Sequence, residues 1–124
     1  MAGVKPLRWI ASAKNDLSAM PIEVRRGVGY ALFAAQQGEK HDDAKVLKGF
    51  GDAGVLEVIA RRDGDTFRAV YTVRFGDVVY VLHVFQKKSK RGIATPKKEL
   101  ELIRKRLKLA EEDHKRWRAT ERPA

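Results

Sequence analysis

The residues of this sequence that could most readily take part in chemistry are a cluster of cationic side chains. It lies in the segment HVFQKKSKRGIATP (83–96), where an apolar run ends and Lys87, Lys88, Lys90 and Arg91 follow. Such a cluster attracts polyanions. Crowded lysines can also transfer protons, because each positive neighbour disfavours the charged form of the next. The alternative interpretation of the same residues is a solvated loop between two structural elements.

The positive charge of the chain is unevenly placed. The 124 residues carry a formal net charge of +10, of which residues 1–85 contribute +2 and residues 86–124 contribute +8. A field of this size favours encounter with RNA, DNA or an acidic protein partner. Charge alone does not choose among these partners, and it is also compatible with simple solubility.

Several classes of site and of protein are disfavoured by the composition. The chain has no cysteine, and its three histidines, His41, His83 and His114, lack the short spacings of zinc ligands, so we expect no metal and no cofactor. Neither a Gly-x-Gly-x-x-Gly motif nor a Gly-Lys-Ser/Thr phosphate loop is present, and no serine lies on a recognisable nucleophile turn.

The apolar segments are too short for a membrane helix. The longest run, Val78 to Phe85, falls far below the ~20 residues that a span needs. The N-terminal residues MAGVKPLRW lack the apolar stretch of a secretory signal. We therefore expect a cytoplasmic protein without a membrane partner.

The elements that must position the cations follow from periodicity. Residues 4–10 resemble a short edge strand, Ser12 can cap a helix that ends near Met20, and a second helix runs from Pro21 to Gly38. One apolar stripe marks the second helix, formed by Val24, Val28, Ala31, Leu32 and Ala35. Two glycines inside it, Gly27 and Gly29, cost about 1 kcal/mol each relative to alanine, which predicts close helix packing.

Three β-rich runs come after a polar loop at 39–45. They are residues 55–61, 66–75 and 77–85, separated by Gly/Asp turns that are typical of antiparallel hairpins. A final helix begins at Thr95-Pro96, with Thr95 as its cap. It repeats a stripe of Leu100, Ile103, Leu107, Ala110, His114 and Trp117, and residues 120–124 are expected to fray.

The resulting order is βααβββα in a single domain, residues 1–124. It predicts an α+β fold with a small twisted antiparallel sheet packed against helices. Alternation along 66–75 places Arg68 and Tyr71 on opposite faces, and alternation along 77–85 places His83 with Val79, Val81 and Phe85. Both faces of 77–85 are apolar, which indicates a central strand, and His83 is expected to be a core histidine with a satisfied hydrogen bond.

Several of these pieces in this order resemble the RelE/ParE toxin superfamily. They are Leu47-Lys48-Gly49, the strand Leu56-Glu57-Val58-Ile59, then Phe67-Arg68-Ala69-Val70-Tyr71, and finally His83-Val84-Phe85-Gln86-Lys87-Lys88 before Thr95-Pro96 and a helix. The phage-related HigB-like branch is the nearer match, and the resemblance covers nearly the whole chain. The chain differs from RelE-type members in having Val58 and Ala60 where those place lysines, and in having no tyrosine after Tyr80.

The resemblance implies a type II toxin that enters the ribosomal A site and cuts mRNA without a metal. The ribose 2′-OH attacks the adjacent phosphate, which requires a base, an acid and cations. By resemblance, Arg68, Lys87 and Lys88 form the catalytic set, with Arg68 stabilising the phosphate. Candidate RNA contacts are Lys48, Arg61, Arg62, Lys90 and Arg91. The implied partners are a helix-turn-helix antitoxin, mRNA and the ribosome with its rRNA.

Two other functions remain open at this point. One is a ParE-like toxin that poisons DNA gyrase and cuts nothing, and the other is a non-catalytic basic RNA-binding domain. A cationic constellation that converges on one cleft would favour cleavage over both.

Overall fold

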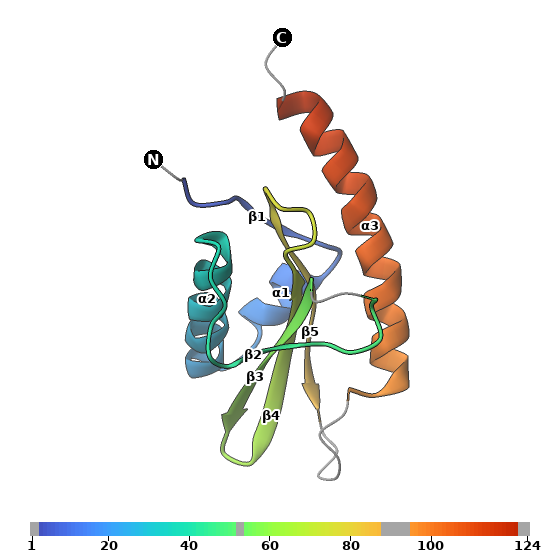
Figure 1. Ribbon diagram of the computed structural model, residues 1–124. Helices are drawn as coiled ribbons and strands as arrows, with labels where there is room; N and C mark the ends of the chain where they lie inside the picture. The colour runs from blue at the N-terminus through green and yellow to red at the C-terminus, as the bar shows by residue number, and fades with distance from the viewer. Residues whose placement is uncertain (1–2, 52–53, 88–94, 122–124) are drawn as a thin grey trace.

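The computed structural model of the protein describes residues 3–51, 54–87 and 95–121 (Figure 1). Within these residues the chain forms three helices and five strands. In chain order they are β1 (Leu7–Trp9), α1 (Ala13–Ser18), α2 (Ile22–Gln36), β2 (Ala44–Val46), β3 (Val55–Arg62), β4 (Asp65–Thr72), β5 (Val79–Lys87) and α3 (Lys97–Glu121). The predicted α+β class is confirmed, and the order gains one strand, β2, in the segment predicted as a polar loop.

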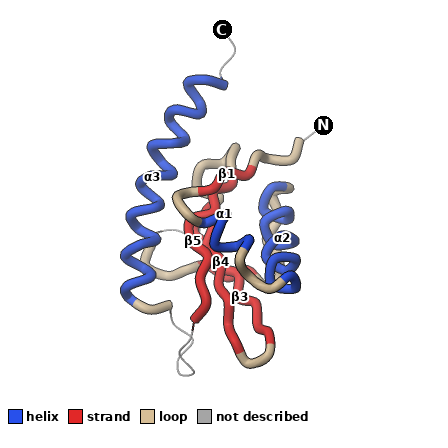
Figure 2. Tube along the Cα trace, turned by 180° about the vertical axis from the view of Figure 1, so that it is seen from behind, coloured by secondary structure: helices blue, strands red, loops and turns tan. Residues whose placement is uncertain are grey.

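One five-stranded sheet with the order β1-β5-β4-β3-β2 forms the middle layer of the molecule. Helices α1 and α2 cover one face of the sheet and α3 covers the other (Figures 1 and 2). The pairs β2–β3, β3–β4 and β4–β5 are antiparallel, whereas β1 runs parallel to β5. The sheet is therefore mixed and not purely antiparallel as predicted. A long connection through α1 and α2 separates β1 from the hairpins, so β1 can pair with β5 in a parallel direction, which a short hairpin turn would not allow.

The two cores lie on the two faces of the sheet. The predicted stripe of α2 is buried throughout and packs with α1 against residues such as Ala69, Tyr71 and Val79. On the other face, Ile103 and Ala110 of α3 are fully buried against Val70 and Leu82. Because β5 contributes to both cores, it is the central strand that its two apolar faces predicted.

A bulge in β5 changes which of its side chains share a face. Val70 pairs with His83 but Tyr71 pairs with Val81, so Leu82 is the extra residue on β5. As a result Val84 joins Val79 and Val81 in the core under α2, while Phe85 joins Tyr80 and Leu82 under α3. The prediction that His83 and Phe85 share a face with Val79 and Val81 was wrong, because strict alternation ignores the bulge.

Two predicted caps are also wrong. The Ser12 hydroxyl donates to the Asp16 carboxylate (2.7 Å) and makes no capping bond to the backbone of α1. The Thr95 hydroxyl donates to the Glu57 carboxylate (2.6 Å) across 38 positions of sequence. Thr95 therefore ties the start of α3 to the sheet. At its other end, α3 continues through Thr120 to Glu121, two residues into the stretch expected to fray.

Polar side chains fix the position of α3 along the sheet. Arg8 of β1 donates two hydrogen bonds to Asp113 (2.6 and 3.0 Å), and the hydroxyl of the buried Tyr80 donates a third (2.7 Å). Nearer the N-terminal end of α3, the Arg106 guanidinium donates to the Leu82 carbonyl (3.0 Å). These contacts hold α3 in one position on the sheet and so determine which residues at the start of α3 lie over β3.

Among the residues that the structure describes, none of the helices combines the length and the apolar character that crossing a membrane requires.

Candidate functional site

The sheet face under α3 collects most of the charged strand residues. In an antiparallel pair, directly opposite residues point to the same face. Lys45 is opposite Glu57, Arg61 is opposite Thr66, and Arg68 is opposite Phe85. Lys87 is opposite Thr66 as well, so the end of β5 places its side chain on this face too. The sequence-predicted residues Arg61, Arg68 and Lys87 are thus brought to one side of the sheet.

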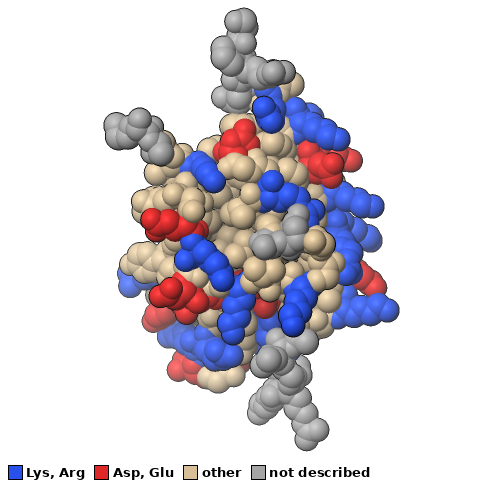
Figure 3. Space-filling view, viewed as in Figure 1, with Lys and Arg blue, Asp and Glu red and all other residues tan. Residues whose placement is uncertain are grey.

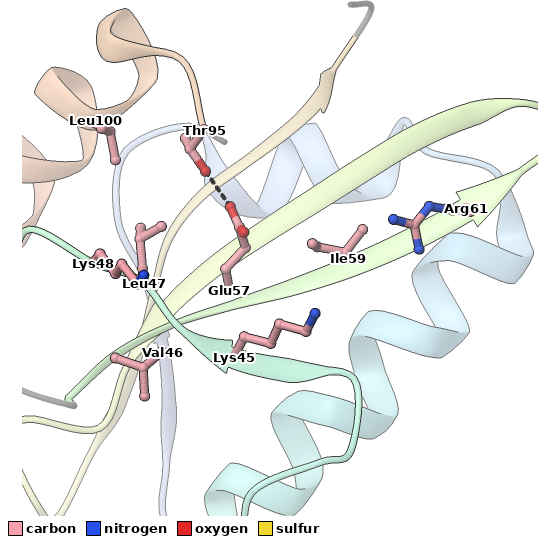
Figure 4. Close-up of a pocket in the computed structure, with 9 residues that line it drawn as sticks. All are labelled: Lys45, Val46, Leu47, Lys48, Glu57, Ile59, Arg61, Thr95 and Leu100. Carbon is pink, nitrogen blue, oxygen red and sulfur yellow. Dashed lines mark hydrogen bonds between the residues drawn. The ribbon is translucent and has the colours of Figure 1, made fainter. Parts of the chain in front are cut away.

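A pocket of about 400 Å³ opens on this face between β2, β3 and the start of α3 (Figure 4). Exposed lysine and arginine side chains form part of its rim, and aliphatic side chains and a carboxylate form the rest. The lining residues are Lys45, Val46, Leu47, Lys48, Glu57, Ile59, Arg61, Thr95 and Leu100. Figure 4 shows Lys45 extended along the face of β3 while Glu57 points to Thr95.

A buried polar network lies beneath this pocket. The Arg68 side chain is 2% exposed, and its Nη1 donates to Glu57 Oε1 (2.8 Å) and more weakly to Thr95 Oγ1 (3.3 Å). Thr95 Oγ1 in turn donates to the second carboxylate oxygen of Glu57 (2.6 Å). Both oxygens of Glu57 are therefore engaged, and the carboxylate is held in one orientation at the pocket wall. Arg68 reaches the pocket through Glu57 rather than directly.

The segment between β2 and β3 holds Lys48 at the rim by packing on α3. Phe50 is buried in the core under α3, and the Arg104 guanidinium lies 5.2 Å from the centre of its ring. Gly49 has a φ of 99°, and a Cβ added there would lie 3.3 Å from Arg104 Nη2. Glycine is favoured at this position because of its left-handed backbone conformation, whereas the Arg104 side chain could shift by the small distance that a Cβ would need.

Other candidates from the sequence are placed differently. Arg62 forms an ion pair with Glu23 of α2 (2.5 Å), on the far side of the sheet from the pocket. Lys87 is buried at the end of β5, and it does not line the pocket. Lys88, Lys90 and Arg91 lie outside the described residues.

Sequence reasoning missed Lys45 and Glu57 as members of the site. Lys45 was counted within a polar loop, and only its pairing opposite Glu57 in the short strand β2 turns it toward the pocket. A signal for Glu57 was available, because a carboxylate in the middle of the apolar run VLEVIA indicates a buried, partnered charge.

His83 is a core residue with satisfied nitrogens, as predicted. It is 7% exposed, its Nε2 contacts the Glu99 carboxylate, and Arg106 Nη1 lies 3.3 Å from its Nδ1. An arginine beside Nδ1 makes that nitrogen the acceptor, so Nε2 carries the proton toward Glu99. The ring also stacks on Phe85 at 4.7 Å. These contacts join β5 to α3 and leave His83 outside the pocket.

The site combines features that suit an anionic polymer. Three cations at the rim can contact phosphate oxygens, and the fixed carboxylate of Glu57 can accept a proton or a hydrogen bond. Further lysines and arginines gather along α3, at the edge of the view in Figure 3. Within the described residues, no three His, Asp or Glu side chains cluster in a way that could hold a metal ion.

Comparison with known proteins yields one match. The sequence profile of the family described as "Phage derived protein Gp49-like (DUF891)" matches residues 15–108, well over half of the chain. Neither the search of curated proteins nor the search of solved structures gave a match. The matched range contains the pocket, the network beneath it and the first half of α3. The chain therefore belongs to the phage-derived Gp49-like family, which is known as a family of RelE/HigB-like toxins of toxin–antitoxin systems.

Proposed function

We propose that the protein is the toxin of a type II toxin–antitoxin system and acts as a ribosome-dependent mRNA endoribonuclease that inhibits translation. Family membership supports the toxin role. The observation that carries the nuclease proposal is the convergence of Lys45, Lys48 and Arg61 on a pocket whose wall holds the Glu57 carboxylate. A gyrase poison or a passive RNA-binding domain does not need a fixed carboxylate beside its cations.

The proposed reaction is attack by a ribose 2′-OH on the adjacent phosphorus, which forms a cyclic phosphate and releases the 5′-oxygen. Glu57 is the one carboxylate lining the pocket among the described residues, and we assign it as the acceptor of the 2′-OH proton. Lys45, Lys48 and Arg61 stabilise the charge that develops on the phosphate oxygens. Lys45 or Lys48 at the rim, or Lys88, supplies the proton to the leaving group, and Lys87 takes part only if substrate binding brings it to the pocket.

Arg68 has a different role in this proposal from a freely accessible phosphate clamp. Its guanidinium is buried and hydrogen-bonded to Glu57 and Thr95, so it cannot contact a phosphate in the observed arrangement. In the observed arrangement Arg68 fixes the orientation of Glu57 and keeps its charge compensated. Lys90 and Arg91 remain proposed contacts to the RNA backbone, together with Lys48 and Arg61.

The test is mRNA cleavage by the purified protein with and without ribosomes, mapped by primer extension. Lys45→Ala and Arg61→Ala should each reduce the cleavage rate by about ten- to a hundredfold, because each removes a charge aimed at the transition state. Both side chains are exposed, so the fold should not change. Lys14→Ala removes an equally exposed cation from α1, on the other face of the sheet, and should cleave like the wild type.

Cleavage that is equal in the Lys45, Arg61 and Lys14 variants would show that this pocket is not the active site. If the wild type cut no mRNA on ribosomes while its expression arrested DNA replication, the ParE-like alternative would replace the nuclease. Harmless expression without any partner would remove the toxin proposal altogether.

A further inference from the structure

The outer face of α2 carries large apolar side chains that are exposed to solvent. Among the described residues, no other part of the chain covers them. Ile22 is 47% exposed, Phe33 is 49% exposed and Tyr30 is 67% exposed. The core stripe of the same helix is already buried against the sheet. Helix α2 is therefore apolar on two sides, which is unusual for a helix at a protein surface.

The exposed residues are spaced as a contact stripe for another helix. Ile22, Arg26, Gly29 and Phe33 follow one another at steps of four, three and four, the spacing of a helix–helix seam. Phe33 is nine residues from the buried Val24, which places the two about 180° apart around the helix. The outer stripe thus lies directly opposite the stripe that holds α2 on its own sheet.

Gly29 has no reason within the chain to be a glycine. A Cβ added there would meet nothing within 4 Å, and the same is true of Gly27, so the predicted close packing of these glycines inside the molecule is wrong. Each glycine still costs about 1 kcal/mol of helix stability relative to alanine. Between Ile22, Arg26 and Phe33, the missing side chain of Gly29 leaves a hollow that a side chain of a second helix can fill.

The charge of the molecule selects among possible occupants. Arg25 and Arg26 lie exposed on α2, and Glu23, the one acidic residue of this helix, is paired with Arg62 of β3. A second copy would bring these arginines against those of its partner, which opposes association. An acidic amphipathic helix would gain both the apolar contacts and the attraction to Arg26.

We propose that the outer face of α2, formed by Ile22, Arg26, Gly29 and Phe33, docks an amphipathic helix with acidic flanks that belongs to the antitoxin. This inference rests on the proposed toxin function. It adds the surface by which the toxin is recognised and the chemistry of the partner that recognises it.

The test uses two matched glycine variants of the full-length protein. Gly29→Glu adds a bulky, negative side chain to the hollow of the stripe, whereas Gly27→Glu adds the same side chain about 160° away around the helix. Both replace glycine by a better helix former in open space, so both variants should melt at or above the temperature of the wild type. The probe is the purified antitoxin, which we expect to be encoded by the gene beside that of the toxin, and its Kd is measured by titration calorimetry.

We expect Gly29→Glu to weaken binding by more than about tenfold and Gly27→Glu to change it by less than about twofold. Equal binding of both variants, or no binding of this probe to the wild type, would overturn the docking surface. A wild type that is dimeric in light scattering, and that Gly29→Glu makes monomeric, would assign the face to a second copy instead. Ribosome-dependent cleavage by both variants is measured separately, so that failure of the docking inference and failure of the nuclease proposal remain distinct.

Discussion

Arg68 and Glu57 compensate each other in a part of the sheet where neither charge could stay alone. Both are less than a tenth exposed. Removing one partner of such a buried pair leaves the other charge unpaired, which costs about 3–5 kcal/mol. We therefore expect Arg68→Ala to lower the free energy of unfolding by this amount in urea denaturation.

The double variant Glu57→Gln/Arg68→Met is the control for that measurement. It removes both charges, so it should be more stable than Arg68→Ala while it still lacks the proposed base. A stable but inactive double variant would separate the chemical role of Glu57 from its structural one. If Arg68→Ala unfolded at the same urea concentration as the wild type, the pair would have no structural role.

Tyr71 provides a contrasting case on the other face of the sheet. Its side chain is 1% exposed, and its hydroxyl has no hydrogen-bond partner among the described residues. Burial raises the pKa of the Tyr71 hydroxyl to about 12. Because an unsatisfied buried hydroxyl destabilises the fold, we expect Tyr71→Phe to be neutral or to stabilise the protein by ~1 kcal/mol in thermal denaturation.

Cleavage by Tyr71→Phe should also match that of the wild type, since Tyr71 packs under α2 and away from the pocket. A large loss of cleavage with unchanged stability would mean that this tyrosine takes part in the reaction.

At the scale of a whole element, α2 is less stable than it could be, because it has two glycines in its interior. Gly27→Ala and Gly29→Ala should each raise the free energy of unfolding by up to about 1 kcal/mol, because a methyl group fits in open space at both positions. Denaturant titration of the two single variants and the double variant would check this. Destabilisation by either substitution would mean that α2 packs more closely than the structure shows.

The attachment of α3 depends on pH through Asp113. The hydrogen bonds from Arg8, and after them the one from Tyr80, hold the pKa of Asp113 below its ordinary value. A carboxyl whose folded pKa is lowered contributes stability that is complete above its unfolded pKa of about 4 and is lost as the pH falls through the folded pKa.

Asp113→Asn should therefore destabilise the protein by about 1 kcal/mol at pH 7, since Arg8 is partly exposed and the ion pair is screened by solvent. The difference between wild type and variant should shrink as the pH falls below about 4. Urea denaturation at pH 7 and at pH 3 measures it, and a difference that stays constant over this range would exclude the ion pair as its cause.

The elements of this fold could be predicted where periodicity is strong. The stripes of α2 and α3 and the central place of β5 all follow from the order of apolar residues. The bulge at Leu82 could not be predicted. Both faces of β5 are buried, so the strand is apolar on both faces and its sequence looks the same with or without an extra residue. The strand β2 is only three residues long, and its pairing with β3 rather than its own sequence creates it.

The same distinction holds for the site. Arg61 could be named from the sequence because it lies at the end of a predicted strand, and Lys48 because it lies in the Leu47-Lys48-Gly49 stretch that carries the family resemblance. Lys45 depends on the register of β2, and the enclosure of Arg68 depends on Thr95, which is 27 residues away in the chain. Contacts between distant segments therefore decide which cations face the pocket, and the type of residue alone does not.

At the scale of the whole molecule, the positive charge can be divided by the face on which it lies. Lys45, Lys48 and Arg61 line the pocket on the side of α3, whereas Lys14, Arg25 and Arg26 lie on the helices of the other side. Both sets are exposed and carry three charges. If RNA follows the pocket, only the first set should exchange counterions with its phosphates.

Salt dependence can measure this division. For single-stranded RNA, each phosphate contact contributes about 0.7 to the slope of log K against log salt. Replacing the three pocket cations by alanine should lower the slope for a short oligonucleotide by about 2, as measured by fluorescence anisotropy. Replacing Lys14, Arg25 and Arg26 removes the same net charge and should leave the slope nearly unchanged. Equal changes in both triple variants would mean that RNA is attracted by the net charge of the molecule and not held at the pocket.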